Sequence, residues 1–170
     1  SNVGRSVHTL AVKATNRFEA TRDKVQKYLN AKYREEIIFT KGATEAINLV
    51  ASSYGKKYIK KGDEVLITEL EHHSNYVPWN FLRTEKGAAI KFAQVNEGGD
   101  VEIEEIKKLI TNKTKMIAIT HISNVTGAVL PITKIVDLAK EKNIPVLIDG
   151  TQGAPHSKID MQKIGCDFYT

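Results

Sequence analysis

Short runs of consecutive apolar residues recur along the chain, and each run ends in a polar or glycine-containing stretch. Runs of this kind, rich in Ile, Val and Phe, are typical of strands buried on both faces of a parallel sheet. The pattern predicts strands over residues 36–40, 65–68, 90–95, 116–124 and 146–149, with another strand starting at 167.

Between these runs, apolar residues recur at the spacing of an amphipathic helix. Residues 1–10 are polar without a clear period, and we expect a loop or arm there. Strands that alternate with helices indicate parallel crossovers. We therefore predict an α/β fold, with a mostly parallel sheet flanked by helices over residues 15–31, 43–50, 76–85, 103–110 and 132–142.

The composition limits the class of protein. The chain has 170 residues, enough for one good core, so we expect one domain or part of one. Hydrophobic residues make up 41% and charged residues 26%, as in ordinary globular proteins, and no apolar run approaches the roughly 18 residues of a membrane span. No signal peptide opens the sequence, and the single cysteine, Cys166, cannot form an intrachain disulfide. We expect a cytoplasmic protein without a membrane partner.

The net charge is +5, which raises the question of a nucleic-acid partner. The lysines are spread along the chain, and the densest group is Lys56, Lys57, Lys60 and Lys61. We interpret this group as the solvated end of a helix, where cations lie near the negative pole of the dipole. No nucleic-acid partner is expected.

The start of the helix predicted at residue 43 is a candidate phosphate site. A glycine precedes Ala43 and Thr44, so free backbone amides and a hydroxyl are expected at the positive end of the helix dipole. The alternative is that Thr44 only caps its helix. The usual glycine-rich motifs for dinucleotides and nucleoside triphosphates do not occur here.

Two adjacent histidines, His72 and His73, follow the apolar run at 65–68. Neighbouring side chains diverge, and no Cys or third His is suitably spaced, so we expect no metal site. The flat imidazole of one of them, His72, is a candidate for stacking on a planar heteroaromatic ring. The alternative is a pair of surface histidines on a loop.

Polar groups end the apolar runs at 116–124 and 146–149. A helix joins these runs, so a right-handed parallel crossover would place Asn124 and Asp149 on the same edge of the sheet if the strands are neighbours. Open α/β sheets bind ligands at that edge. Asp149 and Gln152 are therefore candidate binding groups, although an acid after a strand can also merely cap the next helix.

Taken together, these groups suit a phosphorylated, flat, basic heterocycle whose ring nitrogen stays protonated next to a carboxylate. His121 is expected inside its strand or packed beneath it rather than in catalysis.

Four motifs in this order and spacing resemble the pyridoxal-phosphate enzymes of the class V aminotransferase group, most closely the SufS-type cysteine desulfurases. The motifs are Gly42-Ala43-Thr44-Glu45-Ala46-Ile47-Asn48, Glu71-His72-His73-Ser74-Asn75, His121-Ile122-Ser123-Asn124-Val125 and Asp149-Gly150-Thr151-Gln152. Shorter matches are Asn2-Val3, His8-Thr9-Leu10 and Cys166-Asp167-Phe168-Tyr169. The resemblance covers essentially the whole chain, and it implies part of the large cofactor-binding domain of a fold-type I enzyme.

The resemblance implies roles for individual residues. Thr44 and the backbone of Ala43 would hold the phosphate of pyridoxal 5'-phosphate, and His72 would stack on its pyridine ring. Asp149 would pair with the pyridinium nitrogen, which keeps the ring an electron sink.

Two amides complete the implied site. Gln152 would hydrogen-bond the ring oxygen of the cofactor, and Asn124 would orient that oxygen or the substrate carboxylate. In such a site, His72 and Asp149 are the residues implied in catalysis.

The implied activity is removal of sulfur from L-cysteine, giving L-alanine and an enzyme persulfide. A sulfur-acceptor protein would receive the sulfur for iron–sulfur cluster assembly, and the complete enzyme would be a homodimer. Alternatives are a selenocysteine lyase, an epimerase-like member of the group, and a folded fragment without catalysis. A nicotinamide-dependent reductase lacks support, because the glycine-rich turn and the acid that follows it are absent.

The same resemblance predicts parts that residues 1–170 lack, namely an N-terminal segment and the C-terminal small domain. The Schiff-base lysine would follow Thr170, so Lys158 and Lys163 are not its equivalents, and Cys166 is expected to be structural. The chain alone is thus expected not to turn over cysteine. Gly4 and Ala43 depart from residues common in relatives, which puts at most one phosphate hydrogen bond in doubt.

Overall fold

The structure is a computed structural model that describes residues 8–170. The motif residues Asn2, Val3 and Gly4 lie outside the described residues. The chain divides into two compact units. The smaller unit consists of the described part of Ser1–Phe39 together with Lys158–Lys163, and the larger of Thr40–Ser157 and Ile164–Thr170.

A long helix, α1 (Thr9–Leu29), forms most of the smaller unit. The imidazole of His8 accepts a hydrogen bond from the backbone amide of Leu10 and so caps the first turn. The helix begins earlier than predicted, and the expectation of a loop over residues 1–10 was wrong for its last two residues. The Leu, Ala and Lys residues before position 15 are strong helix formers, and they extend the helix without needing an amphipathic period.

The strand predicted over residues 36–40 was also wrong. A short 3-10 helix, η1 (Arg34–Glu36), precedes a stretch that pairs with no described strand. The Phe39 ring instead packs edge-on against Phe18 of α1, with ring centroids 5.2 Å apart, and the Arg22 guanidinium lies 5.1 Å from the Phe39 centroid. Phe39 of this apolar run therefore packs against α1 and does not join a sheet.

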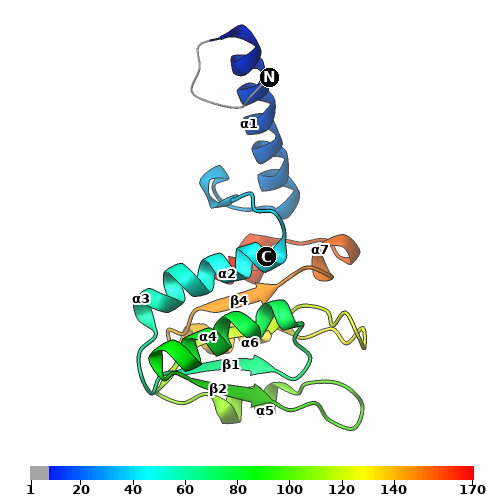
Figure 1. Ribbon diagram of the computed structural model, residues 1–170. Coiled ribbons are helices and arrows are strands. Elements are labelled where there is room, and N and C mark those ends of the chain that lie inside the picture. The colour runs from blue at the N-terminus through cyan, green and yellow to red at the C-terminus, as the bar shows by residue number, and fades with distance from the viewer. Residues whose placement is uncertain (1–7) are drawn as a thin grey trace. The chain divides into compact units, whose positions relative to one another are not determined.

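Five parallel strands form the sheet of the larger unit, in the order β2-β1-β3-β4-β5. Their bounds are β1 Glu64–Thr68, β2 Ala89–Ala93, β3 Thr114–Thr120, β4 Val146–Asp149 and β5 Phe168–Tyr169. The arrowheads of β1, β2 and β4 point the same way in Figure 1, so the strand ends that carry the polar motifs share one edge. The predicted α/β class is confirmed.

Helices connect the strands at nearly the predicted positions. The helix predicted at 43–50 is longer than expected, because α2 runs on through the π-helical η2 and α3. Further bounds are α2 Ala43–Val50, η2 Ala51–Gly55, α3 Lys56–Tyr58, η3 His73–Asn75, α4 Val77–Lys86, α5 Ile103–Leu109, α6 Ile132–Glu141, α7 Gly153–His156 and α8 Met161–Ile164.

Apolar side chains on both faces of the sheet bury its central strands. Val65 and Ile67 of β1 pack in one core with side chains of α2 and α4, such as Ile47 and Trp79. Because side chains alternate along a strand, Leu66 faces the other side. On that side, α5 contacts α6 and β2, and α6 contacts β4. This burial on both sides explains why the strands appear in the sequence as continuous apolar runs.

Strand β3 ends earlier than the predicted 116–124. The chain leaves the sheet after Thr120, and an isolated antiparallel bridge joins Ile122 to Val129. Between them, the Ser123 hydroxyl accepts hydrogen bonds from the amides of Val125 and Thr126 and stabilises a turn. The turn lifts the end of the predicted strand off the sheet.

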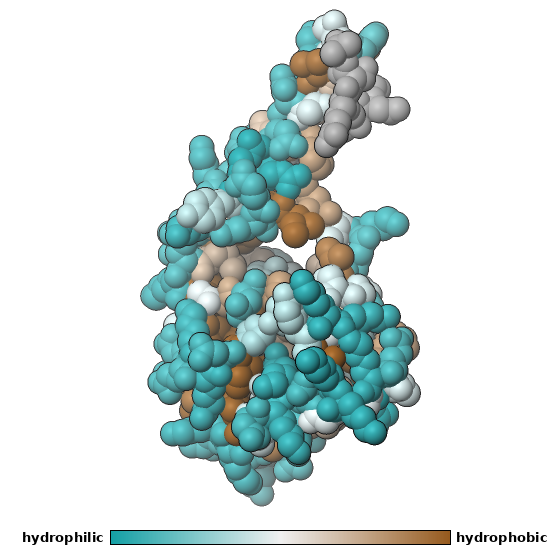
Figure 2. Space-filling model, turned by 90° about the vertical axis from the view of Figure 1, so that its left-hand side faces the viewer, coloured by the Kyte–Doolittle hydropathy of each residue, from teal (hydrophilic) through white to brown (hydrophobic). Residues whose placement is uncertain are grey.

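The surface of the larger unit, the broader body in Figure 2, is mainly hydrophilic on the face shown. Lys56 and Lys57 are exposed in α3, and Lys60 and Lys61 are exposed just after it, as predicted for a solvated helix end. Within residues 8–170, no helix is long and apolar enough to cross a membrane.

Candidate functional site

The polar motifs meet at the carboxyl edge of the sheet. Strands β3 and β4 are neighbours, with Thr120 in register with Asp149, so the condition for Asn124 and Asp149 to follow strand ends on the same edge is met. The motif that begins at Glu71 follows β1, which lies on the other side of β3. This edge therefore brings together side chains that are far apart in the sequence.

Asp149 is a buried carboxylate with a fixed orientation. Only 4% of the residue is exposed. The amide of Thr151 and its hydroxyl both donate to Oδ1 of Asp149, at 3.0 and 2.6 Å. Because both bonds go to the same oxygen, the second oxygen is the one that suits a cationic ligand.

Two glycines next to Asp149 allow close packing behind it. A Cβ at Gly150 would overlap the Tyr169 ring, and one at Gly153 would overlap the His121 ring. His121 Nδ1 and the Tyr169 hydroxyl lie 3.1 Å apart. Burial lowers the pKa of His121 and raises the pKa of Tyr169. His121 therefore packs against Tyr169 just beyond the end of β3, rather than inside the strand.

The start of α2 lies against the loop that carries His72. The hydroxyls of Thr44 and Ser74 are 3.0 Å apart, and the Ser74 hydroxyl lies 2.9 Å from Nδ1 of His72. The Ser74 amide also donates to that nitrogen, at 3.2 Å. Ala43 is the first residue of α2, so its amide is among those that the helix leaves free. Thr44, Ser74 and His72 thus form one connected polar surface beside the helix terminus.

Glu71 belongs to this edge, although sequence reasoning gave it no role. Its carboxylate accepts hydrogen bonds from the Thr68 hydroxyl at 2.6 Å, the Asn75 amide group at 2.7 Å and the Thr120 backbone amide at 2.9 Å. Burial, together with the nearby charge of Asp149, raises the pKa of Glu71 to about 7 despite these bonds. The only signal in the sequence is an acid within a motif next to His72.

The two predicted amides follow neighbouring strands. Asn124 lies in the exposed turn after β3, farther from the strand end than expected, because β3 stops at Thr120. Gln152 is half-buried and directly precedes α7. The hydrogen bonds of the Asp149 carboxylate come from Thr151, and neither amide bonds to it. The roles of Asn124 and Gln152 in cofactor binding stay predictions.

His72 and His73 do not converge on one point. Their ring centroids are 6.0 Å apart and the ring planes make an angle of 88°. No group of three or more His, Cys, Asp or Glu side chains in the described part of the chain is placed to hold a metal ion. Cys166 is half-buried, and burial raises its pKa to about 12, so its thiol is a poor nucleophile.

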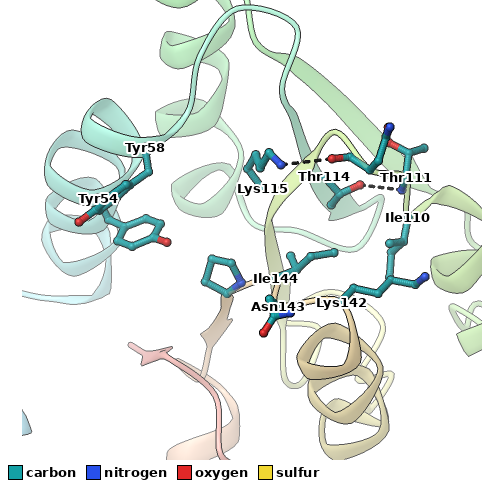
Figure 3. A pocket seen from close by; sticks show the side chains of 11 residues that line it. Tyr54, Tyr58, Ile110, Thr111, Thr114, Lys115, Lys142, Asn143 and Ile144 are labelled. Atoms are coloured by element: carbon teal, nitrogen blue, oxygen red, sulfur yellow. Dashed lines mark hydrogen bonds between the residues drawn. The ribbon is translucent and has the colours of Figure 1, made fainter.

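A separate pocket opens at the opposite edge, where β3 and β4 begin (Figure 3). It has a volume of about 360 Å³ and contains none of the predicted site residues. Lys115 and Lys142 line it together with Tyr54 and Tyr58. Lys115 is engaged with the backbone oxygen of Asn112 at 3.2 Å.

Comparison with known proteins shows which family the chain belongs to. The sequence model described as "Aminotransferase class-V" matches residues 1–170. The chain belongs to this family. The resemblance to the class V aminotransferase group is therefore confirmed, and the parallel sheet agrees with the fold-type I class of its structural relatives.

Several relatives of this class-V chain carry a specific name. A "Probable cysteine desulfurase" from Halalkalibacterium halodurans is 46% identical over 169 residues, which is 99% of this chain and 42% of the relative. One from Staphylococcus aureus is 48% identical over 170 residues, which is 100% of this chain and 41% of the relative.

Solved structures agree. The cysteine desulfurase CsdA from Escherichia coli has a TM-score of 0.89 at 36% identity, covering 99% of this chain and 42% of that one. The apo cysteine desulfurase from Thermococcus onnurineus has a TM-score of 0.93 at 34% identity, with the same coverage. The class-V chain thus spans about two fifths of the length of these relatives.

Proposed function

We propose that the protein containing this chain is a pyridoxal-phosphate-dependent cysteine desulfurase. It would act on L-cysteine in the cytoplasm as a homodimer and pass sulfur to an acceptor protein for iron–sulfur cluster assembly. The observation that carries the proposal is the buried Asp149 on the same sheet edge as the Thr44–Ser74–His72 surface. The names of the relatives support the choice of substrate.

The residues present fit pyridoxal phosphate. Its dianionic phosphate suits the free amides at the start of α2 and the Thr44 hydroxyl. Its planar ring suits the flat imidazole of His72, and its basic nitrogen suits Oδ2 of Asp149, the oxygen that Thr151 does not bond. Gln152 and Asn124 supply amides for the ring oxygen and the substrate carboxylate.

When bound, this group delocalises the negative charge that remains on Cα after an amino acid loses its proton. Asp149 would hold a proton on the ring nitrogen by charge-assisted hydrogen bonding. His72 would fix the ring plane, and its own tilt would be fixed by Ser74 at 2.9 Å. In the overall reaction, the sulfur atom of cysteine is transferred to an enzyme thiol, which yields alanine and an enzyme persulfide.

The test uses the complete protein with pyridoxal phosphate. We expect visible absorption from bound cofactor, and release of alanine from L-cysteine in step with persulfide formation. Selenocysteine is compared as substrate, because a much higher turnover with it would reassign the protein as a selenocysteine lyase. Absence of cofactor binding at micromolar concentration would contradict the proposal as a whole.

A further inference from the structure

Glu71 joins three segments at the carboxyl edge, and it has no part in the function proposed above. Its Oε1 accepts from the Thr68 hydroxyl at the end of β1 and from the Thr120 amide at the end of β3. Its Oε2 accepts from the side chain of Asn75 in η3. One carboxylate therefore ties two strand ends to the loop that carries His72.

The orientation of Asn75 is fixed from its other end. Its Oδ1 accepts from the indole Nε1 of Trp79 at 3.1 Å. An indole nitrogen only donates, so Oδ1 must face Trp79 and the amino group must face Glu71. Asn75 and Trp79 are completely buried. All three partners of Glu71 thus donate, which matches an ionised carboxylate.

The network reaches both halves of the candidate site. Thr120, which donates to Glu71, lies opposite Asp149 in the register of β3 and β4. On the other side, His72 follows Glu71 directly, and Ser74 precedes Asn75. A shift of the Glu71 carboxylate would therefore change the distance between the His72 ring and the Asp149 carboxylate.

We propose that Glu71 is a positioning residue, which as an ionised carboxylate holds the His72–Ser74 loop at the correct distance from Asp149. The choice of ligand for the test rests on the proposed function, whereas the anchoring role of Glu71 does not.

Few charged groups surround Glu71. Asp149 faces it from β4, and its charge opposes ionisation of Glu71. Glu69 and His73 line the same pocket of about 500 Å³ beside β1 and β2. Binding of pyridoxal phosphate should therefore weaken at acidic pH as Glu71 takes up a proton. The plot of affinity against pH should show this fall as a limb near pH 7.

The decisive variants are Glu71→Gln and the double variant Glu71→Gln/Asn75→Asp in the complete protein. The oxygen of the introduced glutamine can still accept from Thr68 and Thr120, but its amino group meets the amino group of Asn75. In the double variant, the introduced aspartate accepts from both the glutamine at position 71 and the indole of Trp79. It therefore restores every bond and moves the charge to position 75.

We expect Glu71→Gln to raise the Kd for pyridoxal phosphate about tenfold, equivalent to about 1.4 kcal/mol. It should also remove the limb near pH 7, since His72 and His73 are unchanged and cancel in the comparison. The double variant should regain most of the affinity. The matched control is Glu102→Gln, because Glu102 accepts from Asn96 at 3.0 Å in an exposed loop. It should bind as the wild type does.

If Glu71→Gln does not fold, Thr68→Val takes its place. This change removes one donor and keeps the charge, so the limb should move to higher pH. Unchanged affinity and pH profile in Glu71→Gln would overturn the proposal, as would equal losses in the single and double variants.

Hydrogen exchange of the Thr120 amide separates this inference from the proposed function. It should speed up in Glu71→Ala, which removes the acceptor of this amide, whether or not cofactor binds. Failure of the wild-type protein to bind pyridoxal phosphate would refute the proposed function. Unchanged exchange of the Thr120 amide would refute the positioning role of Glu71.

Discussion

Asp149 shows how local bonds prepare a side chain for a ligand. Thr151 supplies two donors to Oδ1, and a buried position with 4% exposure keeps water from competing. The acid therefore holds its orientation before any ligand arrives, which avoids an ordering cost on binding.

Asp149→Asn tests this charge with little change in shape. The asparagine oxygen can still accept from Thr151, but the charge that would keep a ring nitrogen protonated is lost. We expect turnover of cysteine by the complete protein to fall about 10- to 100-fold, the worth of a hydrogen bond to a charged group. Asp137→Asn, at an exposed position of α6, should have no effect. Equal turnover in both variants would contradict the role of Asp149.

The hydroxyl of Thr44 can be tested with two ligands. Thr44→Val removes the hydroxyl next to Ser74 and should weaken pyridoxal phosphate binding about tenfold, because a hydrogen bond to a charged phosphate is lost. Pyridoxal without phosphate should bind equally to both proteins. Thr84→Val is the control, since Thr84 bonds only within α4. Equal weakening of both ligands would indicate general damage to the site rather than a phosphate contact.

The Tyr169 ring of β5 packs against Gly150, the residue that follows β4. Gly150→Ala would place a methyl group in the Tyr169 ring, and we expect a loss of about 1–3 kcal/mol in the free energy of unfolding, measured by urea titration. The matched control is Gly42→Ala, where a Cβ meets nothing within 4 Å. Combining Gly150→Ala with Tyr169→Ala should remove most of the extra loss, and additive losses would refute the clash.

The sequence predicted the central strands well, because Val65 to Ile67 and Val146 to Ile148 are buried on both faces and must be apolar. It failed where the same pattern serves another purpose. Phe39 is apolar because it packs on Phe18, and 41% of it stays exposed. Helix α1 extends through residues whose backbone preference, rather than burial, decides their conformation.

The candidate site divides in the same way. Asp149 and Thr44 could be found because each stands at the end of an apolar run or the start of a helix. Glu71 could not, since its meaning depends on Thr120, which is 49 residues away in the sequence. Ser74 was part of a motif, but only the fold brings it to Thr44.

For the whole molecule, Glu71 links the site to pH-dependent stability. Its pKa is raised from 4.5 to about 7, so its contribution is complete below about pH 4.5 and is lost as the pH rises through about 7. Between pH 5 and 8, the wild type should lose about 1–3 kcal/mol of unfolding free energy relative to Glu71→Gln, by urea titration. Glu102→Gln should keep the wild-type slope. Parallel curves for wild type and Glu71→Gln would contradict this assignment.

The central claim is that the carboxyl edge of the sheet is the cofactor site. It is tested most directly by a crystal structure of the complete protein with pyridoxal phosphate. We predict the phosphate at the start of α2, the ring against His72 and the ring nitrogen at Asp149. Cofactor bound elsewhere, for example in the pocket lined by Lys115 and Lys142, would contradict the account.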